Sequence, residues 1–317
     1  MQSKSDQVSK KTQLQNNRLF RLVQDYFDPL SKDTGRLNRV NKEFNGFFNN
    51  YYQTARLMKS IASGNQQLMT NMISNHPELL TQKVSMLVGN MSLKKVSPFE
   101  FILWTMDVRY MGAAILNAIH ASPDGDAIRN TLLLQYSDRL SRPGISYRKN
   151  NTPYTEQYFD YAAYANALQS YIDNYDARTE EECMAAWLRI GIMQRDLPTY
   201  IRQHYCDSEV PFTPEASFQS PEFNRNLRVL NLENNEFEEW TDELEDLGTT
   251  FAISYHTMGE TPCAAKLSYC PTAEMVQRDL DAFKKLIKTR LNDENLLIQL
   301  LKTPGCKLVS DSNPKCI

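Results

Sequence analysis

The sequence predicts an all-α protein, an irregular array of helical hairpins stacked in two lobes. Glycine is scarce, with 11 residues among 317, and apolar residues recur at helical spacing along most of the chain. Hydrophobic residues make up 41% and charged residues 23% of the chain, which is typical of a folded globular protein. Stacked hairpins bury their inner faces against each other, and the faces left outside commonly bind other proteins.

The first part of the chain is expected to fold into helix pairs. A helix from Leu14 to Tyr26 is stopped by Asp28-Pro29, and a second helix follows from about Thr34. Gly64-Asn65 can then turn the chain between two further helices. The apolar stripe of these two helices comprises Leu57, Ile61, Leu68, Met72 and Ile73.

Residues 81–96 are predicted to connect two such pairs, with an extended stretch around 84–88. Ser97-Pro98 opens the next pair, because Ser97 can cap the free N–H groups of a helix and a proline in the first turn needs no donor. A short helix over 132–140 is expected to end at residues 141–144. The polar stretch from there to Pro153 is the predicted domain boundary.

The strongest amphipathic pattern follows this boundary. Thr179 and Glu182 form the sequence of a capping box at the start of the helix after it. Residues 207–222 are predicted to be a loop, and two further helices are expected at about 235–256 and 273–301. The amphipathic pattern itself predicts one continuous helical seam, because its apolar residues are spaced three or four apart: Tyr154, Tyr158, Tyr161, Ala165, Leu168, Ile172 and Tyr175.

These elements divide the chain into four predicted parts. They are an N-terminal tail with a helix pair over 1–50, a helical region over 51–145, a C-terminal helical domain over 153–303 and a mobile tail over 304–317. No apolar run approaches the roughly 20 residues that span a bilayer, so no membrane span is expected.

Charge is distributed unevenly, although the net charge is only −3. Residues 1–60 carry 11 basic against 5 acidic side chains, whereas residues 207–247 carry 2 against 12. The acidic segment is either an ordinary solvated surface or a docking surface for a basic partner, which would accelerate encounter more than it raises affinity. Nucleic acid is not an expected partner of this slightly acidic chain. The candidate binding residues in the acidic segment are Glu236, Glu238, Glu239, Asp242 and Glu243.

The sequence offers little support for catalysis, a metal ion or a cofactor, so we expect a non-enzymatic protein. No glycine-rich phosphate loop, nucleophile elbow or zinc-ligand spacing is present. His76 precedes Pro77, where a capping or packing role is expected. The competing hypothesis is an enzyme with an unfamiliar helical site that uses His256 and Cys263. Six scattered cysteines without C-x-x-C spacing favour a reduced compartment over a disulfide framework.

Two N-terminal segments resemble known protein-binding motifs. Residues 19–29 followed by 37–44 are similar to an F-box, although Asn17-Arg18 replaces its leading Leu-Pro pair. Residues 62–80 with Ser97-Pro98 resemble two ankyrin repeats. Met106 occupies in the second repeat the position that Gly64 holds in the first, and the two are 42 residues apart instead of the usual ~33. The F-box resemblance implies docking to a host ubiquitin-ligase adaptor through Leu19, Leu22, Val23 and Tyr26.

The most specific resemblance is carried by residues 167–175, 187–198 and Tyr205-Cys206. This block is similar to one shared by a paralogous group of effectors that intracellular bacteria inject into host cells through type IV secretion systems. The resemblance implies a protein made in the bacterial cytoplasm and translocated to the host cytosol. It implies no particular activity.

Together these observations predict a non-enzymatic protein that binds and modulates one protein partner across its helical surface. The partner is either a companion bacterial effector, which the protein would restrain, or a host protein. In one form of the second hypothesis, the F-box-like pair recruits a ubiquitin ligase and the rest of the chain presents a target.

Overall fold

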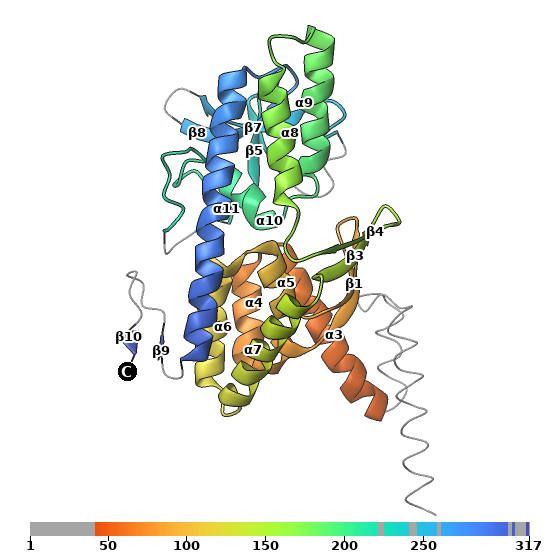
Figure 1. The fold of residues 1–317 in the computed structure, drawn as a ribbon, viewed down its shortest axis with the longest axis vertical. Helices are drawn as coiled ribbons and strands as arrows, with labels where there is room; N and C mark the ends of the chain where they lie inside the picture. Colours follow the sequence, from red (N-terminus) through yellow and green to blue (C-terminus); the bar gives the residue numbers. More distant parts are fainter. Residues whose placement is uncertain are drawn as a thin grey trace, which may run out of the picture.

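The computed structural model describes residues 42–220, 225–240, 246–258 and 261–303, together with the strand residues 306–307 and 315–316. The described chain forms two bodies stacked end to end and joined along one side by a long helix, α11 (Figure 1). We call residues 42–156 the N-terminal body and residues 161–272 the C-terminal body. Each body has its own cluster of buried apolar side chains.

The N-terminal body combines helices with a four-stranded antiparallel sheet in the order β1-β2-β3-β4. One face of this sheet is buried, because buried and exposed residues alternate along β2 and β3. The elements of this body are α3 (Lys42–Ala62), α4 (Gln66–Asn75), η1 (Pro77–Thr81), β1 (Val84–Val88), β2 (Met91–Val96), α5 (Pro98–Thr105), α6 (Val108–Ala121), α7 (Gly125–Ser141), β3 (Ile145–Lys149) and β4 (Thr152–Glu156).

The predicted turn and cap signals of this body are confirmed. Gly64 separates α3 from α4 with a φ of 67°, and a β-carbon there would lie 2.5 Å from the Gln203 side chain. Only glycine meets both demands without strain. Ser97 forms a capping box with Glu100 at the start of α5, in which the Ser97 hydroxyl accepts from the Glu100 N–H at 3.1 Å.

The C-terminal body packs a second four-stranded sheet, in the order β6-β5-β8-β7, against helices. Strand β5 pairs parallel with β8 and antiparallel with β6, while β7 and β8 form an antiparallel hairpin. Its elements are α8 (Tyr161–Asp173), α9 (Glu180–Gln194), α10 (Thr199–Tyr205), β5 (Arg228–Asn231), β6 (Glu236–Glu239), β7 (Ala252–Met258) and β8 (Thr261–Leu267). The capping box predicted at Thr179 and Glu182 is confirmed at the start of α9.

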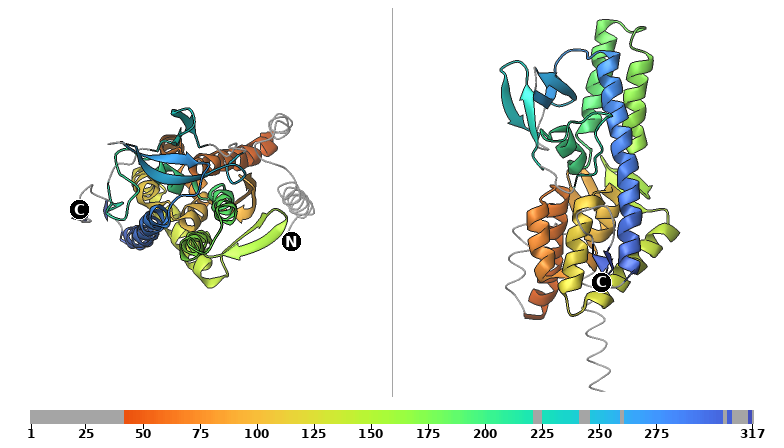
Figure 2. Two further views of the ribbon diagram at one scale, coloured as in Figure 1. Left: turned by 90° about the horizontal axis from the view of Figure 1, so that it is seen from above. Right: turned by 90° about the vertical axis from the view of Figure 1, so that its left-hand side faces the viewer.

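Helix α11 (Ala273–Lys302) belongs to both bodies. Its first half contributes Val276, Leu280 and Phe283 to the C-terminal cluster. Its second half contributes Leu297 and Leu301 to the N-terminal cluster. Figure 2 shows α11 running beside both bodies, and the predicted helix at 273–301 is thereby confirmed. After it, β9 (Cys306–Lys307) pairs antiparallel with β10 (Lys315–Cys316).

The predicted all-α class is wrong, because the protein is a mixed α/β fold with two four-stranded sheets. The helix expected at about 235–256 is replaced by β6, a turn and the start of β7. Asn235 has a φ of 58° and closes the β5–β6 hairpin. The following segment, 249–257, is rich in β-branched and aromatic residues, which favour strands. The irregular helical-hairpin array predicted from periodicity is therefore not the architecture.

Other predicted elements differ in extent. The extended stretch expected around 84–88 is strand β1, and the helix expected at 132–140 is the second half of α7. The polar stretch up to Pro153 contains β3 and the start of β4. The predicted tyrosine seam is too long, because Tyr154 lies on β4 and Tyr158 precedes α8. Periodicity therefore located α8 but misplaced its start.

Candidate protein-binding edge

The strand order of the two large sheets leaves four edge strands in the described chain, namely β1, β4, β6 and β7. An edge strand presents backbone N–H and C=O groups that can pair with another chain. Proteins commonly close such edges with prolines, bulges, charged residues or covering elements. The four edges differ in how they are closed, and this difference identifies the candidate site.

Side chains from two helices cap the edge of β7. The Gln194 amide of α9 donates to the Ile253 C=O at 2.6 Å and accepts from the Ile253 N–H at 2.8 Å. The Asp279 carboxyl of α11 accepts from the Tyr255 N–H at 3.2 Å. These contacts occupy the outer backbone groups of Ile253 and the N–H of Tyr255, so the middle of the β7 edge is closed.

The two edges of the first sheet are also closed. Tyr51 of α3 uses its hydroxyl to donate to the Ser85 C=O at 3.0 Å and to accept from the Ser85 N–H at 3.2 Å. The register of β1 also shifts between Val84 and Met86. On β4, Pro153 lacks an N–H to donate. Neither edge offers a regular row of donors.

The edge of β6 is different, because its outer backbone groups have no partner among the described residues. The Trp240 N–H points towards β5 and donates to the C=O of Leu227, the residue before β5, at 2.6 Å. N–H directions alternate along a strand, so the N–H groups of Phe237 and Glu239 point away from β5. Within the described ranges, no hydrogen bond to these two N–H groups occurs. β6 therefore has an open edge.

The side chains of β6 give this edge an acidic and partly aromatic character. Glu236 and Glu239 are exposed, and Phe237 is 45% exposed. The Phe237 ring stacks under the Arg228 guanidinium, 4.8 Å from its centroid. The Glu236 carboxylate accepts a long hydrogen bond, 3.5 Å, from the Asn234 side chain. A basic extended segment that paired with β6 would meet two carboxylates and an aromatic ring.

Glu238 has a different role from its two neighbours. It forms an ion pair with Lys266 of β8 and accepts a hydrogen bond from the Asn231 amide at 2.7 Å. The hydrogen bond from Lys266, followed by that from Asn231, holds the pKa of Glu238 below its usual value. Glu238 thus ties β6 to the rest of the sheet, and of the three glutamates of this strand it is Glu236 and Glu239 that are exposed.

The remaining predicted binding residues lie outside the described part of the chain. Asp242 and Glu243 follow β6 in the sequence, and both fall in this category. So do the four F-box-like residues Leu19, Leu22, Val23 and Tyr26. The structure therefore brings together three of the nine predicted positions, Glu236, Glu238 and Glu239, on one strand. Phe237 was missed, although the hairpin signal of Asn234-Asn235 between two short runs could have located it.

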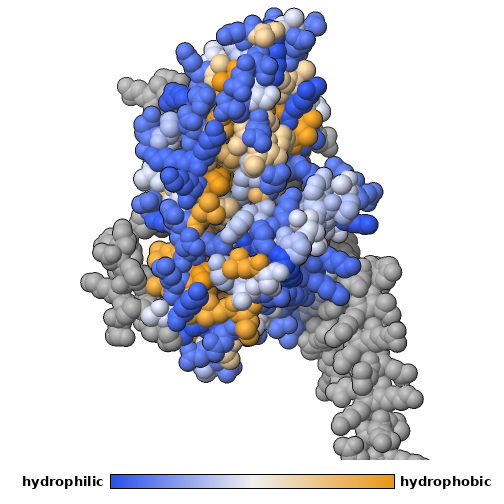
Figure 3. Space-filling view, viewed as in Figure 1, coloured by the Kyte–Doolittle hydropathy of each residue, from blue (hydrophilic) through white to orange (hydrophobic). Residues whose placement is uncertain are grey.

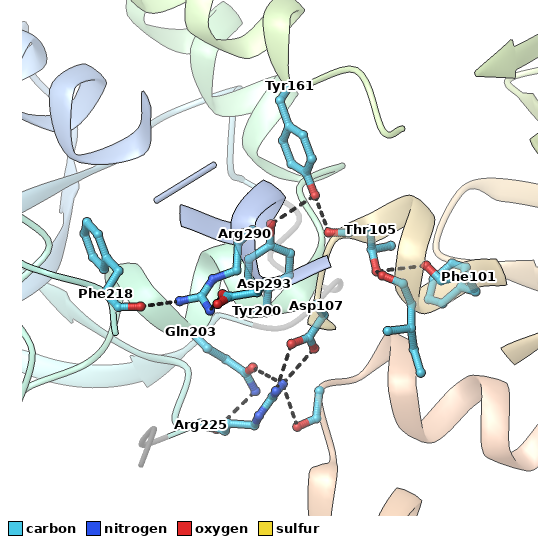
Figure 4. Close-up of polar contacts among 12 residues, drawn as sticks. Phe101, Thr105, Asp107, Tyr161, Tyr200, Gln203, Phe218, Arg225, Arg290 and Asp293 are labelled. Atoms are coloured by element: carbon cyan, nitrogen blue, oxygen red, sulfur yellow. Dashed lines mark hydrogen bonds and ion pairs between the residues drawn. The ribbon is translucent and has the colours of Figure 1, made fainter. Parts of the chain in front are cut away.

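A buried polar junction joins the two bodies (Figure 4). Asp107, before α6, makes a bidentate ion pair with Arg225, with both N···O distances 3.0 Å. The same guanidinium donates to the Gln203 side chain of α10 at 3.2 Å and to the Gly64 C=O at 3.5 Å. The side chains of Asp107 and Arg225 are 7% and 9% exposed. Arg225 thus holds the turn at Gly64 and the turn at Asp107, both in the N-terminal body, against the C-terminal body.

Further contacts extend this junction along α11 (Figure 4). Asp293 accepts from Arg290 at 2.6 Å and from Arg109 of α6 at 2.9 Å. The Tyr161 hydroxyl at the start of α8 donates to the Thr105 C=O at 2.5 Å. These contacts are ion pairs and hydrogen bonds between groups of the two bodies, so we interpret the junction as a structural clamp.

A surface depression of about 330 Å³ lies between α3, α4 and η1. His76 is on its rim, where its backbone N–H donates to the Met72 C=O at 3.0 Å and ends α4. Its ring Nδ1 lies 3.1 Å from the Glu78 carboxylate. His76 thus occupies the C-cap of α4, in agreement with the capping or packing role expected for it. The lining residues are Gln53, Asn71, Met72, Asn75, His76 and Leu79.

The structure also bears on the competing enzyme hypothesis and on metal binding. His256 and Cys263 are opposite each other in the β7–β8 register. Burial raises the pKa of the Cys263 thiol, which disfavours the nucleophilic thiolate. Within the described residues, no group of three or more histidine, cysteine or acidic side chains could hold a metal ion. No described helix is long and apolar enough to cross a membrane.

One face of the molecule also carries apolar side chains. Figure 3 shows them gathered along the lower part of α11 and on the neighbouring α7. Exposed leucines of these helices are Leu134 and Leu140 on α7, 70% and 51% exposed, and Leu291 on α11, 41% exposed. This face has neither the charge pattern nor the open backbone edge that would specify an occupant.

Comparison with known proteins places the candidate edge inside a recognised segment. Residues 164–301 match the family model described as the CBUA0006 C-terminal domain, which spans the second sheet and nearly all of α11. A Coxiella burnetii protein named "Uncharacterized protein CBUA0006" is 25% identical over 230 residues. The alignment covers 68% of this chain and 64% of that protein, so the chain spans less than two thirds of its relative. No solved structure matches.

These comparisons support one part of the resemblance found in the sequence, namely that this chain is similar to a protein of an intracellular bacterium. They indicate neither an F-box nor an ankyrin repeat.

Proposed function

We propose that the chain is a protein-binding protein whose open edge strand β6 docks an extended, lysine- and arginine-rich segment of a partner protein. The observation that carries the proposal is the contrast between the four sheet edges. Three are closed by side chains, a bulge or a proline, whereas β6 presents outward N–H groups at Phe237 and Glu239. The proposal includes no catalytic step and no cofactor.

Strand addition explains both affinity and selectivity at such an edge. Main-chain hydrogen bonds between β6 and the added segment would supply affinity, while Phe237 and the two exposed carboxylates would select its side chains. Charged residues on an edge strand also discourage pairing between identical chains, because Glu236 and Glu239 repel their own copies. A basic segment is the occupant for which these charges are favourable.

The partner is either a companion bacterial effector or a host protein. Affinity purification with the full chain from bacterial lysate and, separately, from host lysate distinguishes the two sources. The test variant is Glu236→Lys with Glu239→Lys. The control is Asp173→Lys with Asp176→Lys, which makes the same charge change at two exposed positions, the last residue of α8 and a residue in the turn after it.

We expect the test variant to reduce recovery of the partner about tenfold or more, because two attractive charges become repulsive. The control variant should recover the partner at the wild-type level. Recovery with wild-type chain should also fall as salt is raised from low to physiological concentration. Equal losses in the two variants would contradict a docking role for β6.

A second variant tests backbone pairing separately from charge. Glu239→Pro removes an outward N–H and leaves the inward hydrogen bonds of β6 intact, whereas Glu239→Ala removes only the charge. We expect the proline variant to bind more weakly than the alanine variant. Equal binding by these two variants would mean that the partner uses side chains alone. Circular dichroism checks that both variants are folded.

The cellular role of the protein is a second part of the proposal. We propose a translocated effector of a type IV secretion system, made in the bacterial cytoplasm and delivered to the host cytosol. It is supported by the resemblance of residues 167–175 and 187–198 and by the similarity to a protein of an intracellular bacterium. A fusion to a translocation reporter should give a host-cell signal from a secretion-competent strain and none from a secretion-deficient strain.

A further inference from the structure

Two cysteines that are 87 positions apart meet at one end of the C-terminal body. Cys183 lies in the first turns of α9 and is 5% exposed, while Cys270 is half-buried in the loop between β8 and α11. The Cys270 thiol donates to the Glu180 C=O, with a sulfur-to-oxygen distance of 3.5 Å. Glu180 lies one turn before Cys183 on α9, and the Cys183 thiol is close enough to raise the pKa of the Cys270 thiol. The two cysteine side chains are therefore neighbours.

Tyr171 of α8 holds this arrangement in place. Its hydroxyl donates to the Pro271 C=O at 2.8 Å and lies 3.1 Å from the Cys183 sulfur. Pro271 directly follows Cys270, so one hydroxyl connects the loop to α9. The Tyr171 ring packs edge-on against Trp187, with centroids 5.7 Å apart. Contacts among α8, α9 and the β8–α11 loop thus hold the two thiols in place.

We propose that Cys183 and Cys270 form a thiol–disulfide site, in which a low-molecular-weight disulfide oxidises the pair to an intramolecular bond that fastens the β8–α11 loop to α9. The site lies at the far end of the C-terminal body from the polar junction. It is independent of the proposed docking edge.

The reaction is an ordinary thiol–disulfide exchange in two steps. The Cys270 thiolate attacks oxidised glutathione, one glutathione leaves as a thiolate, and a mixed disulfide remains on Cys270. The Cys183 thiolate then attacks the Cys270 sulfur and releases the second glutathione. Two S–H bonds of the protein are lost and one S–S bond forms, while one glutathione disulfide is reduced to two thiols. Cys270 reacts first because it is the more exposed of the pair.

The surroundings make this reaction slow at neutral pH. Burial, followed by the neighbouring Cys183 thiol, raises the pKa of Cys270 to about 11. The other titratable or charged groups facing the pair are Tyr171, Tyr175, Glu180 and Arg178, whose guanidinium stacks on the Tyr171 ring. The thiolate is the attacking species, so the rate should rise about tenfold per pH unit below the pKa.

The cross-link would also stabilise the fold. It closes a loop of 87 residues, and a disulfide removes more freedom from the unfolded chain when its loop is long. We therefore expect the oxidised protein to melt several degrees above the reduced protein.

The experiment treats the full chain with oxidised glutathione at pH 8.5, blocks free thiols and digests with trypsin. The expected product joins peptide 179–189 to peptide 267–278. Cys206 and Cys263 serve as the internal control, because both thiols are buried and no hydrogen bond joins them in the described structure. No link between Cys206 and Cys263 is expected.

Two variants separate the steps. Cys183→Ser should accumulate the glutathione adduct on Cys270, because the resolving thiol is absent. Cys270→Ser should leave Cys183 unmodified, because the more exposed thiol is absent. A persistent adduct on Cys270 in the wild-type chain, or an equal yield of the Cys206–Cys263 link, would overturn the site. Formation of the link with no change in melting temperature would overturn the fastening of the loop.

Discussion

Met106 ends α5 in the left-handed backbone conformation, with a φ of 60°. A β-carbon makes this conformation unfavourable by about 1–2 kcal/mol. The Met106 side chain is nevertheless 1% exposed and packs in the C-terminal cluster. Removing a buried side chain of this size costs about 2–5 kcal/mol. Packing therefore outweighs backbone strain at this position.

We expect Met106→Gly to lower the free energy of unfolding by about 1–3 kcal/mol, because the packing lost exceeds the strain relieved. Urea denaturation measures the change. Asn235→Gly is the matched control, since Asn235 also has a positive φ, 58°, but is exposed. Its effect should stay within about 0.5 kcal/mol. A Met106→Gly variant more stable than wild type would show that strain dominates.

Asp279 is a buried carboxyl whose hydrogen bonds, within the described part of the chain, come from neutral groups. It accepts from the Ser254 hydroxyl at 2.9 Å and from the Tyr255 N–H, and burial raises its pKa to about 8. The folded state thus holds a proton that the unfolded state releases near pH 4. The contribution of Asp279 to stability is fully present below pH 4 and is lost as pH rises towards 8.

Asp279→Asn should remove this pH dependence, because the amide does not titrate. Between pH 5 and 8, the free energy of unfolding of the wild type should fall relative to that of the variant by up to about 1.4 kcal/mol per pH unit. Chemical denaturation at several pH values gives the two slopes. Parallel slopes for the two proteins would mean that Asp279 is ionised throughout this range.

At the scale of elements, the bidentate pair of Asp107 and Arg225 is a buried ion pair that joins the two bodies. Breaking a buried ion pair leaves one charge without compensation and costs about 3–5 kcal/mol. We expect Asp107→Asn to destabilise the protein by an amount of this order, measured by urea denaturation. Adding Arg225→Gln to the variant should restore part of the loss, because the uncompensated charge is then removed.

The ion pair of Asp138, near the end of α7, and Arg142, just after it, supplies the control for this prediction. The two side chains are 59% and 36% exposed, and the residues are four positions apart. Exposed pairs contribute about 0–1 kcal/mol. Asp138→Asn should therefore change stability by less than about 1 kcal/mol. Similar losses for Asp138→Asn and Asp107→Asn would contradict the role given to the junction.

Local signals in the sequence located helix ends better than they located strands. The capping boxes at Ser97 and Thr179 were predictable because each depends on residues only three positions apart. The strands β5 to β8 depend on partners distant in the sequence, such as the parallel pairing of Leu230 with Ala265. Short apolar runs do not distinguish a buried strand from a helix, so periodicity favoured the wrong state at 235–256.

The candidate edge was only partly predictable for the same reason. Composition identified the acidic residues Glu236, Glu238 and Glu239, since a charge count needs no partner. Their separate roles depend on the sheet, because Glu238 reaches Lys266 of β8 while Glu236 and Glu239 are exposed. The open edge itself follows from the strand order, which no local pattern specifies.

At the scale of the whole molecule, α11 makes the two bodies depend on each other. Leu280 and Phe283 complete one apolar cluster, and Leu297 and Leu301 complete the other. The folding of the two ends of this 30-residue helix is coupled only while its backbone hydrogen bonds are continuous. Each cluster also contains most of its own apolar residues without α11. We therefore infer that the two bodies unfold together while α11 is intact and unfold separately once it is broken.

Lys288→Pro tests this inference, because Lys288 is exposed near the middle of α11 and its side chain contributes to neither cluster. The proline removes a hydrogen bond and breaks the helix at a cost of about 3 kcal/mol or more, whereas Lys288→Ala keeps the helix intact. By calorimetry, we expect one transition for the wild type and the alanine variant and two transitions for the proline variant. Tryptophan fluorescence in a Trp104→Phe background then assigns one of them to the C-terminal body, where Trp187 and Trp240 are buried. A single transition in the proline variant, shifted to lower temperature, would mean that the junction at Asp107 couples the bodies without α11.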